Sequence, residues 1–293
     1  MPEMIQKSIA SFIVLLFFSL NGTAVQISKT DSVLLQKFWQ YACEHNLASL
    51  PMKDRIITIG RFFLNTPYQA NTLNRTNEEK LVVNLHELDC VTFVENVLAL
   101  SYLPVFNEES FDLFIHNLQR IRYRNGEITD YASRLHYSSV WLYEMGKQKL
   151  LTDETPNIGE LGFKPSVHFM SDNSHLYPPL QDKTLLEKMK RTETEINKRT
   201  YYYIPKHKIG EAYEKIESGD IILITTKTKG LDTSHLGIAY KKDGKIWLLH
   251  ASSQGKKVMF SRQPLYEYMQ GIPSHQGIMI GRAIPQPAPE TPK

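Results

Sequence analysis

The chain has 293 residues, of which 42% are hydrophobic and 22% charged, and its formal net charge at pH 7 is +3. This length is enough for one large domain or two small ones with a buried apolar core. So small a net charge, without a basic stripe interleaved with aromatic residues, excludes nucleic-acid binding from the functions that we expect.

The N-terminus carries an apolar run that is typical of a secretory signal. Lys7 precedes the apolar residues 9–18, and small residues at 22–24 follow where a signal peptidase would cut. The run is short for a membrane span, so we assign residues 1–24 to a signal peptide. We therefore expect an exported, periplasmic protein with no stable membrane insertion after signal cleavage. An uncleaved membrane anchor is the alternative.

Helical patterns dominate the first half of the chain. Apolar residues recur at helical spacing, with a capping residue such as Asp31 or Ser32 before the first stretch. We expect helices over 31–47, 52–64, 90–102 and 111–121. Residues 65–71 are predicted to form a loop because they are rich in Asn and Pro.

The second half changes from irregular sequence to short strands. Residues 151–215 contain several prolines and only a weak helical pattern over 185–198, so we expect an irregular insertion there. From residue 216 onward, alternating runs predict antiparallel strands. These strands are expected over 221–224, 234–240, 246–250, 257–260 and 277–282.

Helices followed by antiparallel strands predict an α+β fold. We expect a single domain over 25–284, mainly helical over 25–150 and with its sheet over 216–284. The proline-rich residues 285–293 are predicted to be a disordered tail.

Cys90 stands at the predicted start of the third helix. Asp89 precedes it as the predicted N-cap, which places the thiol in the first turn, where unpaired N–H groups and the helix dipole favour a thiolate. The alternative is a small buried hydrophobic residue. The only other cysteine, Cys43, lies in an amphipathic stretch, so we expect it to be buried and both thiols to be free. A disulfide between the two is the alternative in an exported protein.

The Asp-Gly dipeptide at 243–244 predicts a two-residue hairpin loop. With that loop, His250 lies opposite Gly237 and His235 lies opposite Ser252, and all four side chains share one face. The two histidines are then diagonal neighbours, roughly 7–8 Å apart at the backbone. The small residue at 237 leaves room for the nucleophile helix, which we expect on this face. The alternative is that each histidine is only a half-exposed strand residue.

A cysteine and two histidines match the requirements of nucleophilic acyl transfer. We assign Cys90 as the nucleophile and His235 as the base that takes its proton and later protonates the leaving amine. His250 would hold the imidazole of His235 in its productive tautomer. A thiolate–imidazolium pair would lower the thiol pKa from about 8.5 to below neutral. The Cys90 N–H and the Tyr68 hydroxyl are candidate oxyanion donors, although Tyr68 is equally compatible with a core position.

A metal site is the alternative for the same stretch. His86 and Cys90 have the i, i+4 spacing of two ligands on a helix. The chain lacks a His-Glu-x-x-His motif and paired Cys-x-x-Cys motifs, so we expect no metal and no organic cofactor.

The candidate residues lie in a series of short motifs. These are Pro-Tyr at 67–68, Asp-Cys at 89–90, Ser-Gly-Asp at 218–220, Ser-His-Leu-Gly-Ile at 234–238 and Leu-His-Ala at 249–251. Their order resembles that of the NlpC-type papain-like cell-wall cysteine hydrolases. The stretches 89–95, 133–137, 203–206 and 232–235 look like the N-acetylmuramoyl-L-alanine amidase branch of that superfamily. The resemblance runs from about residue 31 to residue 282.

The resemblance implies a papain-like domain in which the nucleophile helix packs on an antiparallel sheet, with extra helical segments. It implies hydrolysis of the amide between the lactyl group of N-acetylmuramic acid and L-alanine in peptidoglycan fragments, through a thioester acyl-enzyme. It also implies the same Cys-His-His assignment, and we expect a monomer. A D-glutamyl–diamino acid endopeptidase of the same fold and a non-catalytic cell-wall binding module are the alternatives.

The same resemblance places Arg134, His136, Tyr137 and Ser234 in the substrate cleft. Arg134 would pair with a carboxylate of the stem peptide, and Tyr137 would stack on sugar or peptide. A salt bridge plus core aromatic residues is the alternative. Asn65 departs from the branch, which usually has glycine at this position, but the change touches no catalytic group.

Overall fold

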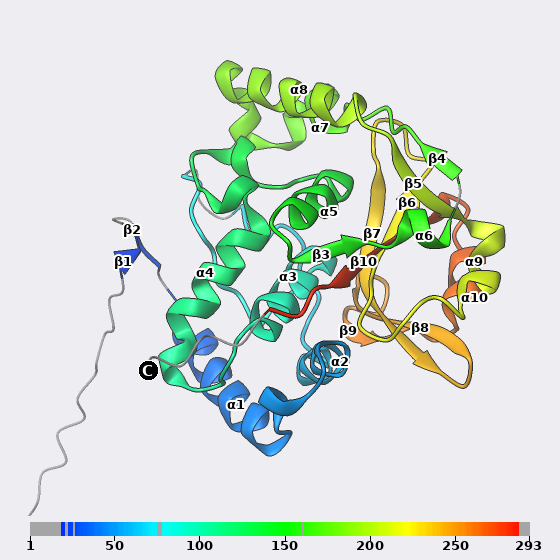
Figure 1. The fold of residues 1–293 in the computed structure, drawn as a ribbon. Helices are drawn as coiled ribbons and strands as arrows, with labels where there is room; N and C mark the ends of the chain where they lie inside the picture. The colour runs from blue at the N-terminus through cyan, green and yellow to red at the C-terminus, as the bar shows by residue number, and fades with distance from the viewer. Residues whose placement is uncertain (1–18, 21–22, 26, 75–77, 160, 287–293) are drawn as a thin grey trace, which may run out of the picture.

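The computed structural model describes residues 19–20, 23–25, 27–74, 78–159 and 161–286. Most of the predicted signal peptide and most of the predicted tail lie outside these residues (Figure 1). Among residues 1–24, the two short strands β1 (Ser19–Leu20) and β2 (Thr23–Ala24) pair with each other. No helix in the described part of the chain has the length and apolar character that crossing a bilayer requires.

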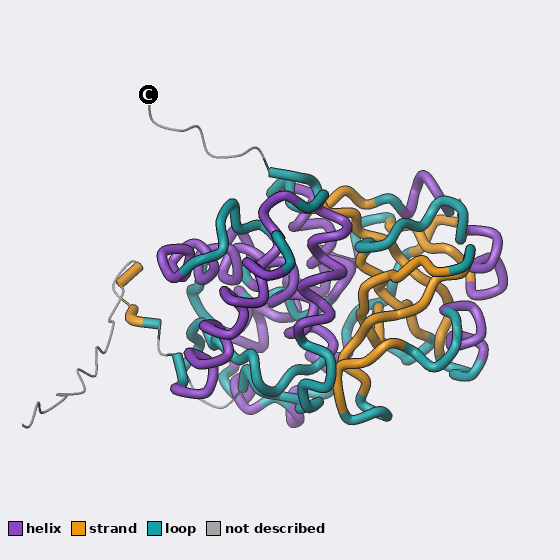
Figure 2. Tube along the Cα trace, turned by 90° about the horizontal axis from the view of Figure 1, so that it is seen from below, coloured by secondary structure: helices purple, strands orange, loops and turns teal. Residues whose placement is uncertain are grey.

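The larger helices lie on one side of a sheet (Figure 1, Figure 2), and the short helices α9 (Ile209–Ala212) and α10 (Leu265–Gln270) lie on its other side (Figure 1). The first helices of the chain are α1 (Lys29–Glu44), α2 (Met52–Phe62), α3 (Cys90–Ser101), α4 (Phe111–Arg122) and α5 (Ser138–Lys147). The predictions for 52–64, 90–102 and 111–121 are confirmed to within two residues. Helix α5 was not among the predicted elements.

The first helix begins before its predicted cap. Ser28 caps α1 by accepting a hydrogen bond from the backbone N–H of Asp31 at 3.0 Å. Asp31 is buried instead, and its carboxylate accepts the backbone N–H of Leu85 at 2.7 Å and contacts Nδ1 of His86 at 2.8 Å. The predicted cap is therefore wrong, because this carboxylate binds the segment that leads to α3.

The sheet is antiparallel at every strand pair. Its order is β4-β5-β10-β6-β7-β8-β9, and β3 also pairs with β10. The strands are β3 (Leu151–Asp153), β4 (Leu161–Phe163), β5 (Tyr201–Pro205), β6 (Ile221–Thr226), β7 (Thr233–Lys242), β8 (Lys245–Ser252), β9 (Lys257–Phe260) and β10 (His275–Ala283). The predicted α+β class is confirmed, and so are all five predicted strands.

Residues 151–215 are more regular than predicted. They supply the strands β3, β4 and β5 to the sheet, together with the helix α8 (Lys183–Asn197). The short helices are α6 (Thr155–Ile158), α7 (Phe169–Asp172) and α9 (Ile209–Ala212), and α10 (Leu265–Gln270) follows between β9 and β10. The expectation of an irregular insertion is thus wrong for this segment.

The hairpin between β7 and β8 has the predicted register. Lys242 lies opposite Lys245, and the pairing continues to Ile238 opposite Leu249. The loop residues at 243–244 have φ angles of 51° and 71°, the left-handed values that a two-residue hairpin turn requires. The Asp-Gly dipeptide therefore fixes which residues of the two strands share a face.

Helix α3, which carries the predicted nucleophile, packs on the opposite face of β7 from the one predicted. Leu236 and Ile238 join the apolar residues of α3 in one core cluster, whereas Ala239 and Leu248 belong to a second cluster with α9 and α10. A Cβ atom at Gly237 would lie 2.6 Å from a methyl carbon of Leu248. The glycine thus makes room for Leu248 rather than for a helix. Helix α3 packs on the other face, where the larger side chains of Leu236 and Ile238 bury its apolar surface.

Candidate active site

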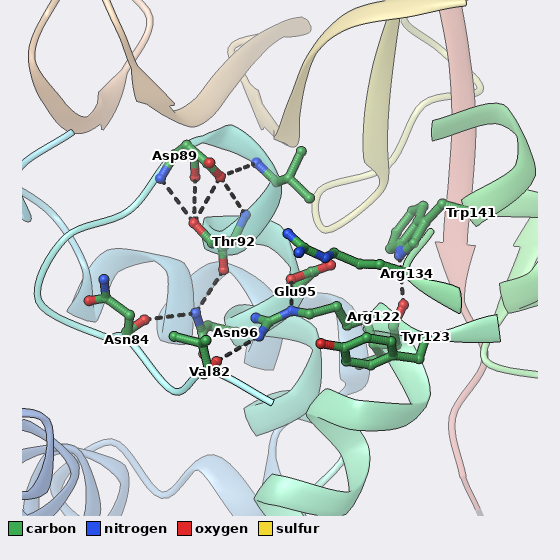
Figure 3. Close-up of polar contacts among 12 residues, drawn as sticks. Val82, Asn84, Asp89, Thr92, Glu95, Asn96, Arg122, Tyr123, Arg134 and Trp141 are labelled. Carbon is green, nitrogen blue, oxygen red and sulfur yellow. Dashed lines mark hydrogen bonds and ion pairs between the residues drawn. The ribbon is translucent and has the colours of Figure 1, made fainter. Parts of the chain in front are cut away.

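Asp89 fixes the start of α3. Its carboxylate accepts the backbone N–H groups of Val91 at 3.1 Å and Thr92 at 2.8 Å (Figure 3). The Thr92 hydroxyl oxygen in turn accepts the backbone N–H of Asp89 at 2.9 Å. This reciprocal capping box places Cys90 in the first turn of the helix, as predicted.

The Cys90 thiol is half-buried and free. Burial, followed by the nearby Asp89 carboxylate, raises its pKa to about 12, although the backbone N–H groups of Leu236, Cys90 and Val91 lower it. The prediction of a thiol pKa below neutral is therefore wrong for this structure, because desolvation outweighs the N–H donors. The thiol is protonated at pH 7, so its proton has to pass to a base during the reaction.

The other cysteine has a different environment from the one predicted. Cys43 is free, as expected, but it is exposed on α1 rather than buried. Its neighbour Ala42 occupies the buried position on that face of the helix. The two cysteines therefore form no disulfide, and only Cys90 lies at the start of a helix.

His235 and His250 are in direct contact, as the hairpin register predicts. Nε2 of His235 lies 2.6 Å from Nδ1 of His250, and the two rings are nearly perpendicular. Since Nε2 of His235 is occupied, its Nδ1 is the ring nitrogen that remains for a thiol. The backbone N–H of the next residue, Leu236, points at the Cys90 sulfur. The sulfur therefore lies beside the start of β7, the strand that carries His235.

Both imidazoles are neutral at pH 7. Burial lowers the pKa of His235 to about 3, with smaller contributions from His250 and His275. Burial alone lowers the pKa of His250 to about 4. A neutral His235 is the protonation state that a general base requires.

Tyr268 and His275 also belong to this cluster, and neither was among the predicted site residues. The Tyr268 ring, on α10, contacts the His250 ring at a centroid distance of 5.6 Å and the His275 ring at 5.9 Å. Burial, followed by the charge of Cys90, raises the pKa of Tyr268 to about 12. The phenol is therefore within electrostatic reach of the sulfur. Helix α10, which carries Tyr268, has only six residues, too few for a helical pattern to reveal it in the sequence.

Tyr68 lies on the loop beside the start of α3. Its backbone N–H donates to the carbonyl of Lys256 at 2.9 Å, and it forms a parallel bridge with Leu88. Burial, then Cys90 and then Asp89, raise the pKa of Tyr68, so its hydroxyl stays protonated and able to donate. Its role as an oxyanion donor stays a prediction.

The backbone conformation of Asn65 accounts for an asparagine where the amidase branch usually has glycine. Its φ angle is 69°, in the left-handed region that glycine adopts without strain. Asparagine is among the few other residues that tolerate this region. Its side chain accepts a hydrogen bond from Nζ of Lys257 at 2.7 Å, so the loop keeps its path beside β9.

Arg134 and Tyr137 have partners inside the protein. Arg134 is 9% exposed and binds Glu79 through Nε at 3.0 Å and Nη2 at 2.7 Å. Tyr137 is 1% exposed, and its hydroxyl donates to Glu193 at 2.7 Å. These contacts correct the predicted substrate contacts, because a guanidinium and a phenol engaged in this way hold the framework together.

The other two predicted cleft residues, His136 and Ser234, differ in their exposure and in their partners. Nε2 of His136 lies 2.8 Å from the carbonyl of Tyr131, and burial, followed by Arg134, lowers the His136 pKa to about 3. Ser234 is exposed at the start of β7, next to His235. A contact between Ser234 and substrate stays a prediction.

His86 has its partner on α1. Its Nδ1 contacts the Asp31 carboxylate at 2.8 Å, which directs the ring toward α1. Within the part of the chain that the structure describes, no three His, Cys, Asp or Glu side chains converge as metal ligands would.

A buried ion pair fixes the segment before Cys90. Nε of Arg122 donates to the Glu95 carboxylate at 2.7 Å, and Nη1 donates to the carbonyl of Val82 at 2.6 Å (Figure 3). The amide of Asn96 also donates to the carbonyl of Asn84 at 3.1 Å. Since Arg122 and Glu95 are 1% and 2% exposed, neither charge has water as an alternative partner.

Replacing Glu95 with alanine is expected to lower the free energy of unfolding by about 3–5 kcal/mol, because it leaves the Arg122 charge buried and unpaired. Urea denaturation measures this loss. Glu187→Ala is the matched control, since it removes an exposed ion pair with Lys190, and we expect little change. Equal losses of unfolding free energy in the two variants would contradict a stabilising role for the buried Glu95–Arg122 ion pair.

Comparisons with known proteins show which family the chain resembles. A family profile described as "AmiA-like: N-acetylmuramoyl-L-alanine amidase-like" matches residues 58–278. No curated protein matches the chain. A Bacteroides uniformis structure described as an N-acetylmuramoyl-L-alanine amidase is 37% identical, with a TM-score of 0.76, and the match covers 80% of this chain and 99% of that one.

Two further structures are similar. A Bacteroides fragilis protein, provisionally named a xylanase, is 39% identical with a TM-score of 0.73, and the match covers 77% of this chain and 99% of that one. A Legionella pneumophila protein, 24% identical with a TM-score of 0.65, shares the fold over 88% of this chain and 95% of its own. The family profile spans the candidate nucleophile and both histidines. The chain therefore belongs to the N-acetylmuramoyl-L-alanine amidase-like family of peptidoglycan-related hydrolases.

Proposed function

We propose that this protein is an exported cysteine amidase of the NlpC-type papain-like superfamily. Its substrate is the amide between N-acetylmuramic acid and L-alanine in peptidoglycan fragments. The observation that carries the proposal is the contact of His235 Nε2 with His250 Nδ1, which leaves Nδ1 of His235 free to act as the base for the helix-start cysteine Cys90. Family membership supports the choice of bond.

The first half-reaction forms a thioester. The Cys90 thiol passes its proton to Nδ1 of His235 as the sulfur attacks the carbonyl carbon of the lactyl group. The oxyanion forms near the first turn of α3, where the N–H of Cys90 and the hydroxyl of Tyr68 are the candidate donors. The C–N bond then breaks, and His235 returns the proton to the amine of L-alanine, which leaves with the peptide.

The second half-reaction releases the sugar. A water molecule gives a proton to the neutral His235 and attacks the thioester carbonyl. The C–S bond breaks, the sulfur regains the proton, and the muramyl carboxylic acid leaves. His250 holds the His235 ring throughout, since its Nδ1 is the partner of Nε2 in both halves.

Product analysis of a muramyl-tripeptide by mass spectrometry tests the proposal. We expect free muramyl sugar together with the intact tripeptide. A shortened peptide still attached to the sugar would indicate an endopeptidase that cleaves after D-glutamate. Unchanged substrate that nevertheless binds the protein would indicate a non-catalytic cell-wall binding module. A split sugar chain would indicate a glycosidase.

A further inference from the structure

A groove of about 500 Å³ begins at His250, the partner of His235. It runs between the turn that joins β8 to β9 and the helix α10, and His250 and Tyr268 line its inner end. Its volume is within the range of sites for small ligands. Among the lining residues the mechanism above uses only His250, so the rest of the groove has no role in the chemistry.

The lining of the groove has the character of a site for an acidic peptide. Arg262 lines it and is exposed, and no ion pair is found for it among the described residues. Gln254, Gln263 and Ser252 supply amide and hydroxyl groups along the walls, and no carboxylate lines the groove. Met259 adds an apolar patch. A ligand with one carboxylate, several amides and short apolar side chains fits this set of partners.

The two parts of the proposed substrate differ in charge. An N-acetylmuramyl group that is linked through its lactyl amide is neutral, whereas the stem peptide carries free carboxylates. A guanidinium binds a carboxylate with paired, charge-assisted hydrogen bonds. The groove therefore suits the peptide side of the scissile bond better than the sugar side.

We infer that this groove binds the stem peptide and that Arg262 holds one of its carboxylates, so that the peptide's N-terminal amide lies at the His235–His250 pair. This inference rests on the proposed function, because it takes the peptide as the leaving group. Arg262 is then a specificity-determining residue that contacts substrate without taking part in proton transfer.

The test compares the KM of wild type with that of Arg262→Gln for a muramyl-tripeptide. We expect KM to rise by about tenfold or more and kcat to change by less than about twofold, because a charge-assisted contact is lost from binding alone. Arg191→Gln, at an exposed arginine on α8 well away from α10, is the matched control and is expected to leave both constants unchanged (Figure 1).

An amidated substrate tests the charge directly. When the peptide carboxylates are converted to amides, the KM of wild type is expected to rise to the level of Arg262→Gln, and the variant is expected to be insensitive. A rise in KM of the same size in wild type and variant would place the carboxylate elsewhere and overturn the inference.

Binding of the free tripeptide separates this inference from the proposed function. Calorimetry with the Cys90→Ala protein needs no turnover, and the expected result is binding that weakens about tenfold or more in the Arg262→Gln background. Equal binding in both backgrounds, or none in either, would overturn the groove assignment even if the amide is cleaved. Peptide binding without cleavage by wild type would overturn the proposed function alone.

Discussion

Replacing Cys90 with alanine is expected to reduce hydrolysis of a muramyl-tripeptide by at least about three orders of magnitude in kcat. The variant keeps the Asp89 capping box and the His235–His250 contact, because neither involves the sulfur. It loses the atom that forms the thioester. Release of the muramyl sugar, followed by mass spectrometry over time, measures the effect.

Cys43→Ala is the matched control for the same assay. Cys43 is the other free thiol and is exposed on α1, so its loss is expected to leave kcat and KM unchanged. In the Cys43→Ala background, a thiol alkylator is expected to abolish activity, whereas a chelator is expected to have no effect. Cys90→Ala protein that is folded and still active would overturn the assignment of the nucleophile.

The parts of the site that depend on local chemistry could be predicted from the sequence. The start of α3 follows from Asp89, whose side chain binds N–H groups two and three residues away. The contact of His235 with His250 follows from a two-residue turn, because the turn fixes the register of both strands. Each inference uses only neighbours in the chain.

The parts that depend on distant partners could not be predicted. Arg134 binds Glu79 and Tyr137 binds Glu193, at separations of 55 and 56 residues. The direction of the Cys90 pKa shift depends on burial by the rest of the fold, which no local pattern reports. Each of these features is set by packing against segments that are remote in sequence.

The unpredicted elements have the same explanation. Helix α5 has most of its residues buried, so it has no polar face and no amphipathic pattern. Strands β3 and β4 have three residues each and are held in place by pairing with β10 and β5. Alternation over three residues carries no usable signal.

Acidification is expected to destabilise the protein well above the pH at which its carboxylates titrate. Burial lowers the pKa of His235 and His136 to about 3 and that of His250 and His275 to about 4. An unfolded histidine binds its proton near pH 6.5, so the unfolded chain takes up protons first as the pH falls. Stability that is present above pH 6.5 is therefore lost as the pH falls toward these folded-state pKa values.

The size of the loss follows from proton linkage. Between pH 7.5 and pH 5.5, each of these histidines is expected to remove about 1.4 kcal/mol from the free energy of unfolding. Four of them approach the whole stability of a typical domain, which is about 5–15 kcal/mol. Burial raises the pKa of the Asp220 and Asp232 carboxyls, and these groups oppose the loss because their folded forms bind protons first.

Urea denaturation of wild type and His136→Gln at pH 7.5, 6.5 and 5.5 isolates the histidine contribution from that of the carboxyls. The glutamine amide can still donate to the carbonyl of Tyr131, which His136 contacts through Nε2, but it cannot take up a proton in the unfolded chain. The dependence of unfolding free energy on pH is expected to fall by the contribution of one histidine, about 1.4 kcal/mol over this range. His207→Gln, at an exposed histidine, is expected to keep the wild-type slope. An unchanged slope in His136→Gln would show that the His136 imidazole exchanges protons as freely in the folded protein as in the unfolded chain, and would contradict its burial as a neutral group.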